Sequence, residues 1–525
     1  MISIVWLKKD LRLHDHAPLL DAAASGKVLL LWLQEPTLWQ TLDASPRHQL
    51  IETACAQSLA ADVQALGGQL WTSAQDALPA FDALRLACAA HGGMTIYSHE
   101  ETGNGASYAR DLALARWCKQ HGIGWHESPR NAVVRRLKSR NDWGKHWAQR
   151  MRLAPFAAPV LGEVHFFPLA LAGFSAVQPL QANQQDGLYL RHTPAGSRAR
   201  LDYFLSHELR NYRRGMSSPV TAPLHCSRLS TQLAFGVLSI RQVIDAVWER
   251  RLVLKDSPLL AGQLDGLRSF EGRLHWHCHF VQKLEDEPRI EFVNMHRGYD
   301  GLRENDFNTA HFDAWASGKT GVPMVDACMR RLNATGWINF RMRAMLMSFA
   351  AYHLWLHWRE TGLHLARQFS DFEPGIHYSQ IQMQSGTTGI NAARIYNPVK
   401  QALDQDAQGT FIRRWCPELA RVPTDFLPHP WLLTPNLQAQ YGCVLGRDYP
   451  NAIVDVTQAG REAKERFHAW RKQSGMAAVA QQVFEKHGSR SPQRSGIAGL
   501  RRKIVVKTQP LNAATPPLIV NAELF

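Results

Sequence analysis

The N-terminal stretch MISIVWLKKDLRLHDH (residues 1–16) and the run VLLLW (residues 28–32) decide the fold of the first third of the chain. Residues 2–6 and 28–32 are β-branched or apolar and have the length of strands. Between them, residues 14–25 have helical periodicity that ends at Gly26. A strand, a helix and a second strand at this spacing predict a parallel βαβ unit.

The same alternation continues to residue 121. We expect further strands at residues 69–72 and 94–98, and helices at residues 47–66, 74–91 and 106–121. Strands that alternate with helices favour a doubly wound parallel sheet with helices on both faces. The sequence therefore predicts an N-terminal α/β domain over residues 1–130.

The rest of the chain has a different pattern. Residues 131–197 contain scattered prolines and few periodic stretches, which predicts an interdomain connector. Helical periodicity dominates residues 198–475, so we predict an all-α second domain. Residues 476–525 hold seven Lys or Arg against two Glu, together with Ser, Gly and Pro, and we predict a flexible basic tail.

Composition narrows the class of protein. A chain of 525 residues suits two domains, and no apolar run approaches the ~18 residues that would span a bilayer. The N-terminus lacks the pattern of a signal peptide, so we expect a soluble, cytoplasmic protein. The eight cysteines have no CxxC-type spacing, which indicates neither disulfides nor a metal site. The net charge of +14 favours a polyanion such as nucleic acid, although many basic proteins bind none.

The segment CSRLS (residues 226–230) combines small hydroxyls and an arginine just before a helical run. Ser227, Ser230 and the backbone N–H groups of a helix start are suited to bind an anion, and Arg228 adds a possible bidentate phosphate contact. The alternative interpretation is a capped helix with a solvent-facing arginine.

A second segment, residues 318–343, has the pattern of a turn, a helix, a break and another helix. Arg341 and Arg343 are two positions apart and therefore face different sides of the second helix. A buried arginine needs a carboxylate partner, and Asp371, Glu373 and Asp326 are the candidates. An exposed basic helix is the alternative.

Six segments in succession give the chain its resemblance to a known family. They are WLKKDLRLHDHAPL, SRLSTQLAFGVLS, WASGKTGVPMVDACMRRLNATGWINFRMR, GTTG, RIYNPVKQ and GTFIRRWCPEL. In order and spacing, over residues 2–475, they resemble the signatures of the photolyase/cryptochrome family, most closely a divergent bacterial DNA photolyase.

The resemblance implies an α/β domain of the antenna type and a helical domain that holds FAD. The implied activity is the light-driven repair of UV-induced pyrimidine dimers, a carbon–carbon lyase reaction in which excited reduced FAD passes an electron to a dimer flipped out of the DNA. The implied partner is damaged DNA, with no membrane partner and no metal, and we expect a monomer. A second antenna chromophore, a folate or a deazaflavin, is possible because residues 99–101 end a predicted strand of the sheet.

Site residues follow from the resemblance position by position. Arg343 and Asp371 resemble the salt bridge beside the flavin ring, and His377 stands where many members present Asn to the flavin N5. The cofactor contacts implied are Tyr212, Cys226, Ser227, Arg228, Leu229, Ser230, Trp276, His277, Trp337, Arg343, Asp371, Phe372, Glu373 and His377. The implied catalytic residues are Trp358, His377, Arg273 and Met383, and the implied DNA contacts are Arg273, Arg341, Met383 and Arg394.

The sequence departs from the family at the electron and substrate positions. Arg273 stands where most dimer photolyases have a Glu that contacts the lesion, and Met383 stands where a Trp stacks on it. Ile381 and Asn305 replace two tryptophans of the usual photoreduction chain, which leaves Trp358 of the three. Photoreduction is therefore expected to run through a different set of aromatic residues, with Trp358, Trp355 and Tyr378 the first candidates to test.

Two other classes of function remain open from the sequence. A cryptochrome-like photosensor would bind FAD without repair, and Arg273 and Met383 favour it. An ordinary flavoprotein or nucleotide-binding protein would bind its ligand without photochemistry.

Overall fold

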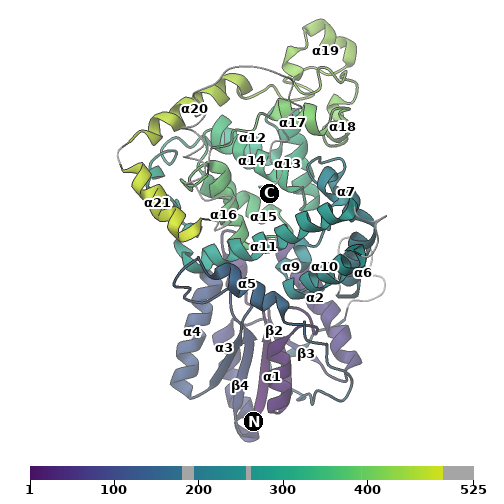
Figure 1. The fold of residues 1–525 in the computed structure, drawn as a ribbon, viewed down its shortest axis with the longest axis vertical. Coiled ribbons are helices and arrows are strands. Elements are labelled where there is room, and N and C mark those ends of the chain that lie inside the picture. Colours follow the sequence, from purple (N-terminus) through teal and green to yellow (C-terminus); the bar gives the residue numbers. More distant parts are fainter. Residues whose placement is uncertain (180–193, 256–261, 392, 474, 489–525) are drawn as a thin grey trace.

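The computed structural model describes residues 1–179, 194–255, 262–391, 393–473 and 475–488, and it has an α/β domain and a larger helical domain (Figure 1). The α/β domain contains a six-stranded sheet in the order β5-β4-β1-β2-β3-β6. Five strands run parallel, and β6 pairs antiparallel with β3 at one edge. The strands are β1 (Ile2–Leu7), β2 (Lys27–Leu33), β3 (Leu70–Ser73), β4 (Met94–His99), β5 (Gly124–Ser128) and β6 (Ser175–Ala176).

Successive side chains of a strand point to opposite sides of the sheet, so strands that are apolar throughout present two apolar faces. Helices cover both of these faces. On one face Val5 and Leu30 pack with side chains from α1 (Ala17–Ser25) and α2 (Pro46–Ala65). On the other face Ile4 and Leu31 pack with α3 (Ala77–Cys88) and α4 (Gly105–His121). The predicted doubly wound α/β domain is therefore confirmed, including the first four strands.

The interdomain connector has more structure than the sequence predicted. Within residues 131–197 the chain forms α5 (Trp143–Arg152), whose Trp143, Trp147 and Met151 are buried in a core that they share with the helical domain. It then returns to the sheet as β6. The connector therefore contains short packed elements, α5 and β6, with proline-containing loops between them.

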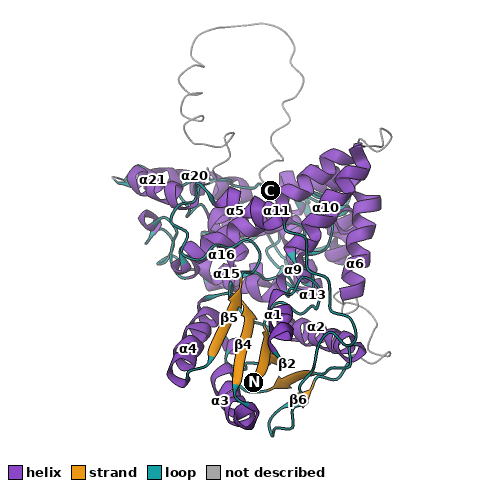
Figure 2. Cartoon of the chain, turned by 60° about the horizontal axis from the view of Figure 1, so that its bottom comes forward, coloured by secondary structure: helices purple, strands orange, loops and turns teal. Residues whose placement is uncertain are grey.

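The second domain is helical, as predicted, and lies over the end of the sheet (Figure 2). None of the helices in the described ranges is long and apolar enough to cross a membrane. The helices of the second domain are α6 (Pro194–Tyr203), α7 (Leu209–Gly215), α8 (Ala222–His225), α9 (Ser230–Ala234), α10 (Ile240–Lys255), α11 (Leu264–Asp286), α12 (Thr309–Ser317), α13 (Pro323–Thr335), α14 (Phe340–Ser348), α15 (Trp358–Gln368), α16 (Pro374–Ser385), α17 (Pro398–Gln405), α18 (Thr410–Trp415), α19 (Pro435–Tyr441), α20 (Val456–Arg471) and α21 (Met476–His487).

The last helix corrects one prediction. Residues 476–487, which the sequence analysis assigned to a flexible tail, form α21. Val483 is buried with Leu284, Ile290 and Met295 of the helical domain. Met476 and Val483 are buried on one face of this helix. The prediction was wrong because it rested on the polar composition of the whole segment and not on the spacing of these two residues. The remainder of the predicted tail, residues 489–525, lies outside the described residues.

The two domains meet through directional polar contacts. The N-terminus lies at the far end of the α/β domain, so β1 runs toward the helical domain (Figure 1). Arg47, at the start of α2, donates to the carbonyl of Asn333 at 2.6 Å and to the carbonyl of Gln368 at 2.5 Å. The next residue, His48, bonds the carbonyl of Phe369 at 2.8 Å. One turn of α2 therefore anchors the sheet domain on the helical domain.

Replacing Arg47 should weaken this junction. Arg47→Met keeps the aliphatic stem but leaves the carbonyls without their donors, so we expect a loss of about 1 to 3 kcal/mol of stability and a lower melting temperature. Arg85→Met is the matched control, since among the described residues Arg85 on α3 bonds only Asp82 of the same helix. Equal melting temperatures for both variants would contradict the role given to Arg47.

Candidate functional site

One cavity lies inside the helical domain, between α14, α15 and α16. We call it the helical cavity. It is bordered by Phe340, Arg343, Ala344, Met347, Leu365, Phe369, Asp371, Phe372, Glu373, Ile376, His377, Gln380, Ile381 and Gln384. Five of these residues lie on α16, which begins at Pro374 directly after Glu373, a residue with an extended backbone.

A charged pair closes one side of the helical cavity. Arg343 donates from both terminal nitrogens to the two carboxylate oxygens of Asp371, at 2.9 and 2.8 Å. Burial acts to raise the pKa of Asp371, but Arg343 and a hydrogen bond from Ser230 outweigh it and hold the pKa below its ordinary value. Of the three predicted carboxylates, Asp371 is therefore the partner of Arg343. Asp326 instead accepts hydrogen bonds from Thr320, Gly321 and Tyr449.

Polar groups without protein partners border the same cavity. The side-chain oxygen of Gln380 and the side-chain nitrogen of Gln384 are buried, and neither has a hydrogen-bond partner among the described residues. Glu373 is also buried, and burial raises the pKa of its carboxyl, which favours the neutral form. A buried amide without a partner is costly unless a ligand or water satisfies it. The sequence analysis did not single out the two glutamines, since no pattern distinguishes them from helix-surface amides.

His377 has one nitrogen committed to the protein. Its Nε2 lies 2.9 Å from the carbonyl oxygen of Gly362, which can only accept, so this nitrogen carries the proton. Burial lowers the pKa of His377 to about 4, so the ring is neutral near pH 7 and its Nδ1 is an acceptor.

The segment predicted to bind phosphate lies at the start of the short helix α9. Arg200 donates to the carbonyls of Cys226 and Ser227 at 2.6 and 2.9 Å and so fixes the turn. Arg228 has a left-handed backbone (φ 60°), and its guanidinium lies over the ring of Trp337, 3.8 Å from the centroid. Leu229 is buried. The predicted contacts Arg228 and Trp337 are thus brought together, and Ser230 joins this segment to Asp371.

Helix α11 carries three of the predicted residues. Arg273 lies beside Met216 and hydrogen-bonds the buried Tyr212, so its side chain is directed toward the 226–230 segment. Trp276 and His277 are half-buried on the same helix. Burial lowers the pKa of His277 to about 4, which favours a neutral ring.

The remaining predicted residues lie farther from the helical cavity or on its rim. Trp358 is buried, and its indole N–H donates to Asn294 at 2.7 Å. Met383 is half-buried on α16, Arg341 is half-buried on α14, and Arg394 is exposed. None of these four borders the helical cavity.

A second cavity lies between the two domains, at the carboxyl edge of the sheet. This interdomain cavity is bordered by Lys8, Lys9, Glu35, Glu101 and Arg110 of the α/β domain, and by Phe372 and Pro374 of the helical domain. Arg110 bonds Glu35 at 2.7 Å and Glu101 at 2.6 Å. Burial raises the pKa of Glu35 to about 7. Phe372 borders both cavities and is the divider between them.

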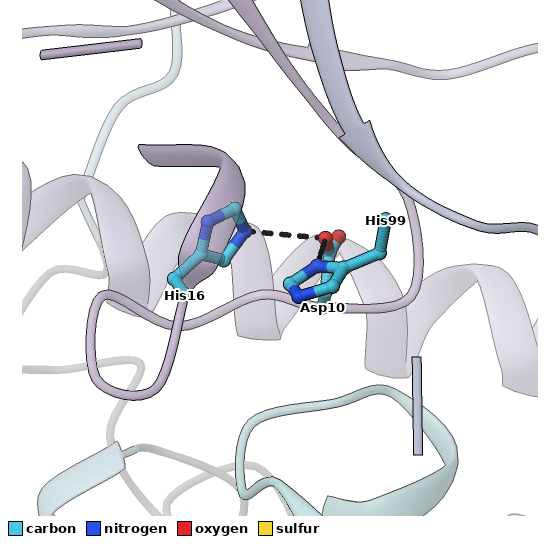
Figure 3. A group of neighbouring side chains, drawn as sticks. All are labelled: Asp10, His16 and His99. Atoms are coloured by element: carbon cyan, nitrogen blue, oxygen red, sulfur yellow. Dashed lines mark hydrogen bonds and ion pairs between the residues drawn. The ribbon is translucent and has the colours of Figure 1, made fainter. Parts of the chain in front are cut away.

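A buried cluster of Asp10, His16 and His99 stands at the same edge of the sheet (Figure 3). Both histidines bond one carboxylate oxygen of Asp10, His16 through Nε2 at 3.1 Å and His99 through Nδ1 at 2.6 Å. The Nδ1 of His16 accepts the N–H of Leu19, so its Nε2 must carry the proton and is not available as a metal ligand. The cluster is therefore a hydrogen-bonded structural group that joins the loop after β1 to the end of β4. The Nδ1 of His99 bonds Asp10, and His99 does not border the interdomain cavity.

Family comparisons cover most of the chain. Residues 3–149 match the DNA photolyase family model, and residues 270–469 match the model for the FAD binding domain of DNA photolyase. The chain is 28% identical over 493 residues to the deoxyribodipyrimidine photo-lyase of Escherichia coli, covering 89% of this chain and 99% of that relative. It is 26% identical over 511 residues to a cryptochrome DASH of Gloeobacter violaceus, covering 89% and 95%.

Solved structures show the same fold. A bacterial class III photolyase from Agrobacterium tumefaciens superposes with a TM-score of 0.73 at 23% identity, over 90% of this chain and 98% of the other. The chain belongs to the photolyase/cryptochrome family.

The residues of the helical cavity fit a flavin ring. Ile376, Ile381 and Phe340 provide apolar contacts, while the unpaired amides of Gln380 and Gln384 offer the hydrogen bonds that a heteroaromatic ring requires. The Arg343–Asp371 pair adds a charged group at the edge of the cavity. This cavity lies within the residues that match the FAD-binding model.

Loss of the Asp371 carboxylate should lower FAD occupancy. Asp371→Ala leaves the Arg343 guanidinium without its partner, at a cost of about 3 to 5 kcal/mol, and Asp371→Asn retains the shape without the charge. Occupancy is measured from the flavin absorbance per chain, together with the melting temperature. The control is Glu418→Ala, which breaks a comparable arginine–carboxylate pair (Arg330–Glu418, 2.7 Å) outside the cavity. Equal occupancy in the wild type and both Asp371 variants would contradict this assignment.

Proposed function

We propose that this protein is a DNA photolyase that repairs UV-induced pyrimidine dimers, with cyclobutane dimers as the substrate. The observation that carries the proposal is the helical cavity, in which a bidentate charged pair and two unpaired amides surround an apolar slot. FAD bound there supplies the light-excited electron donor that splits the dimer.

The residues around the cavity would hold and tune that cofactor. Arg343 provides a fixed positive charge that favours an anionic reduced ring, and Asp371 keeps the guanidinium oriented. His377 offers a neutral acceptor through Nδ1, because its Nε2 is bonded to the chain. The 226–230 segment, with Tyr212 and Arg273, is suited to the phosphates of the cofactor.

Damaged DNA is the proposed partner. The net charge of +14 supports phosphate binding, and exposed Arg394 and half-buried Arg341 are the candidate contacts near the cavity. A flipped dimer needs no base-pair readout, so electrostatic contacts with the backbone suffice to present it.

We further propose that the interdomain cavity takes a second, light-collecting chromophore, a folate or a deazaflavin. The cavity lies at the carboxyl edge of a doubly wound sheet, where ligands of such folds bind. Phe372 borders both cavities, which supports transfer of excitation toward the helical cavity.

The alternative function is a cryptochrome-like photosensor. Arg273 favours it, since this side chain is directed at Tyr212 and Met216 and is not a carboxylate that could accept hydrogen bonds from a lesion. Relatives with both kinds of name match the chain over similar lengths.

A repair assay separates these functions. Reduced, FAD-loaded protein is mixed with an irradiated thymine oligonucleotide, and undimerised thymine is measured after blue light and after darkness. We expect light-dependent restoration. A flavin that is photoreduced without any restored thymine would favour the photosensor, and a folded chain without affinity for FAD would overturn both.

The electron route for photoreduction is expected to favour Tyr378. Its ring contacts His377 and Phe372, which border the helical cavity, and its hydroxyl donates to Asp43 at 2.8 Å. Loss of an electron from Tyr378 would release the phenolic proton directly to the Asp43 carboxylate. Trp355 is less suited, because the guanidinium groups of Arg303 and Arg466 lie over its ring and oppose a positive charge there.

Tyr378→Phe should therefore slow photoreduction of the bound flavin by about tenfold or more, because removal of the proton transfer raises the barrier by ~1.4 kcal/mol or more. Trp358→Phe should reduce the rate as well, and Trp355→Phe should leave it unchanged. Tyr449→Phe is the control, as Tyr449 is also a buried tyrosine bonded to an aspartate (Asp326, 2.6 Å). Unchanged rates in Tyr378→Phe, Trp358→Phe and the double variant would exclude this route.

A further inference from the structure

A third cavity lies at the junction of the two domains and is lined by four arginines. We call it the arginine cavity. Arg12 comes from the loop after β1, Arg130 from the segment between β5 and α5, Arg150 from α5 and Arg241 from the first turn of α10. It measures about 20 Å³, which is room for about one water-sized particle. Neither the flavin nor the second-chromophore proposal uses it.

Arg12, Arg150 and Arg241 are held in place by backbone carbonyls of the junction. Arg12 donates to Gly236 at 2.9 Å and to Asp15 at 3.0 Å. Arg150 donates to Pro129 at 2.8 Å, and Arg241 donates to the carbonyl of Ala154. These bonds use the terminal nitrogens, so the guanidinium groups are fixed by the chain before any ligand arrives.

The other edge of each group has no protein acceptor. The Nε atoms of Arg12, Arg150 and Arg241 are buried and have no hydrogen-bond partner within the described part of the chain. Arg130 is only 7% exposed, and its guanidinium forms no hydrogen bond or ion pair within the described residues, although its charge acts on the buried carboxyls of Glu101 and Glu373. Arg12 and Arg241 are equally buried, at 6% and 4%. Four sets of charged donors thus share one small space.

Negative charge at the junction does not balance them. Among the described residues that line the cavity, Asp15 is the only carboxylate, and its oxygens already bind Arg241 at 3.3 Å and Ser239 at 2.5 Å. Asp10 is bonded to His16 and His99, and Glu101 is bonded to Arg110. Burial lowers the pKa of Arg12. Asp10 and Asp15 act to raise that pKa, whereas repulsion from Arg130 and Arg241 acts with burial, and the pKa stays below its ordinary value.

We propose that the arginine cavity binds one small monovalent anion of chloride size, which links the two domains. A single water has two lone pairs and cannot accept from four donors, whereas a spherical anion can. The anion would offset the buried positive charge at the point where the β1 loop, the connector, α5 and α10 meet. The small volume favours a monatomic anion over a tetrahedral oxyanion such as phosphate.

The test measures the melting temperature of the full-length, FAD-loaded protein as chloride replaces gluconate at constant ionic strength. We expect a saturable rise with chloride and none with phosphate. Arg130→Gln and Arg150→Gln should each weaken the apparent chloride affinity by about tenfold or more, as expected for a lost charged donor. Arg152→Gln is the matched control, because Arg152 lies on the same helix and is exposed.

A second measurement does not depend on the variants folding. Crystals of the FAD-loaded protein grown in bromide should show an anomalous peak among the four arginines. A melting temperature indifferent to chloride, an equal response to phosphate, an equal loss in Arg152→Gln, or water density without a bromide peak would each overturn the proposal.

Discussion

The bidentate pair between Arg343 and Asp371 fixes the one segment of chain that belongs to both main cavities. Asp371 accepts from Arg343 on α14 and from Ser230 on α9, so a single carboxylate connects three parts of the helical domain. Immediately after it, Phe372 faces both cavities and Pro374 begins α16. The position of every cavity-lining residue on α16 therefore depends on this carboxylate, which explains why a buried ion pair of little intrinsic stabilising value has structural importance.

The aromatic divider between the cavities is tied to both domains. Phe372 stacks on His48 of α2, with ring centroids 5.5 Å apart, and meets His377 edge-on at 5.2 Å. His48 and His377 each bond a backbone carbonyl of the helical domain, and burial lowers the pKa of both to about 4. The divider is therefore flanked by neutral rings with fixed tautomers, and its electrostatics should be constant across the physiological pH range.

The sequence predicted the parts of the molecule that have strong periodicity. Apolar runs specified β1 and β2, but β5 was missed because its short edge strand is half-exposed and lacks alternation. The SRLS segment was located, and the resemblance paired Arg343 with Asp371, whereas the residue pattern alone left three carboxylates as candidate partners; the fold brings Asp371 to Arg343. Gln380, Gln384 and the cluster of four arginines could not be predicted, since their significance lies in missing partners, which only a three-dimensional arrangement can reveal.

Several contacts at the junction between the domains are made by side chains that donate to backbone carbonyls. Arg47, His48, Arg12 and Arg367 all bind main-chain oxygens across it. Every residue type offers the same carbonyl, so the accepting surface can exchange its side chains during evolution without losing a bond. Only the few donors are constrained. In such an arrangement many residues of the two domains can be substituted during evolution while the domains keep the same relative orientation.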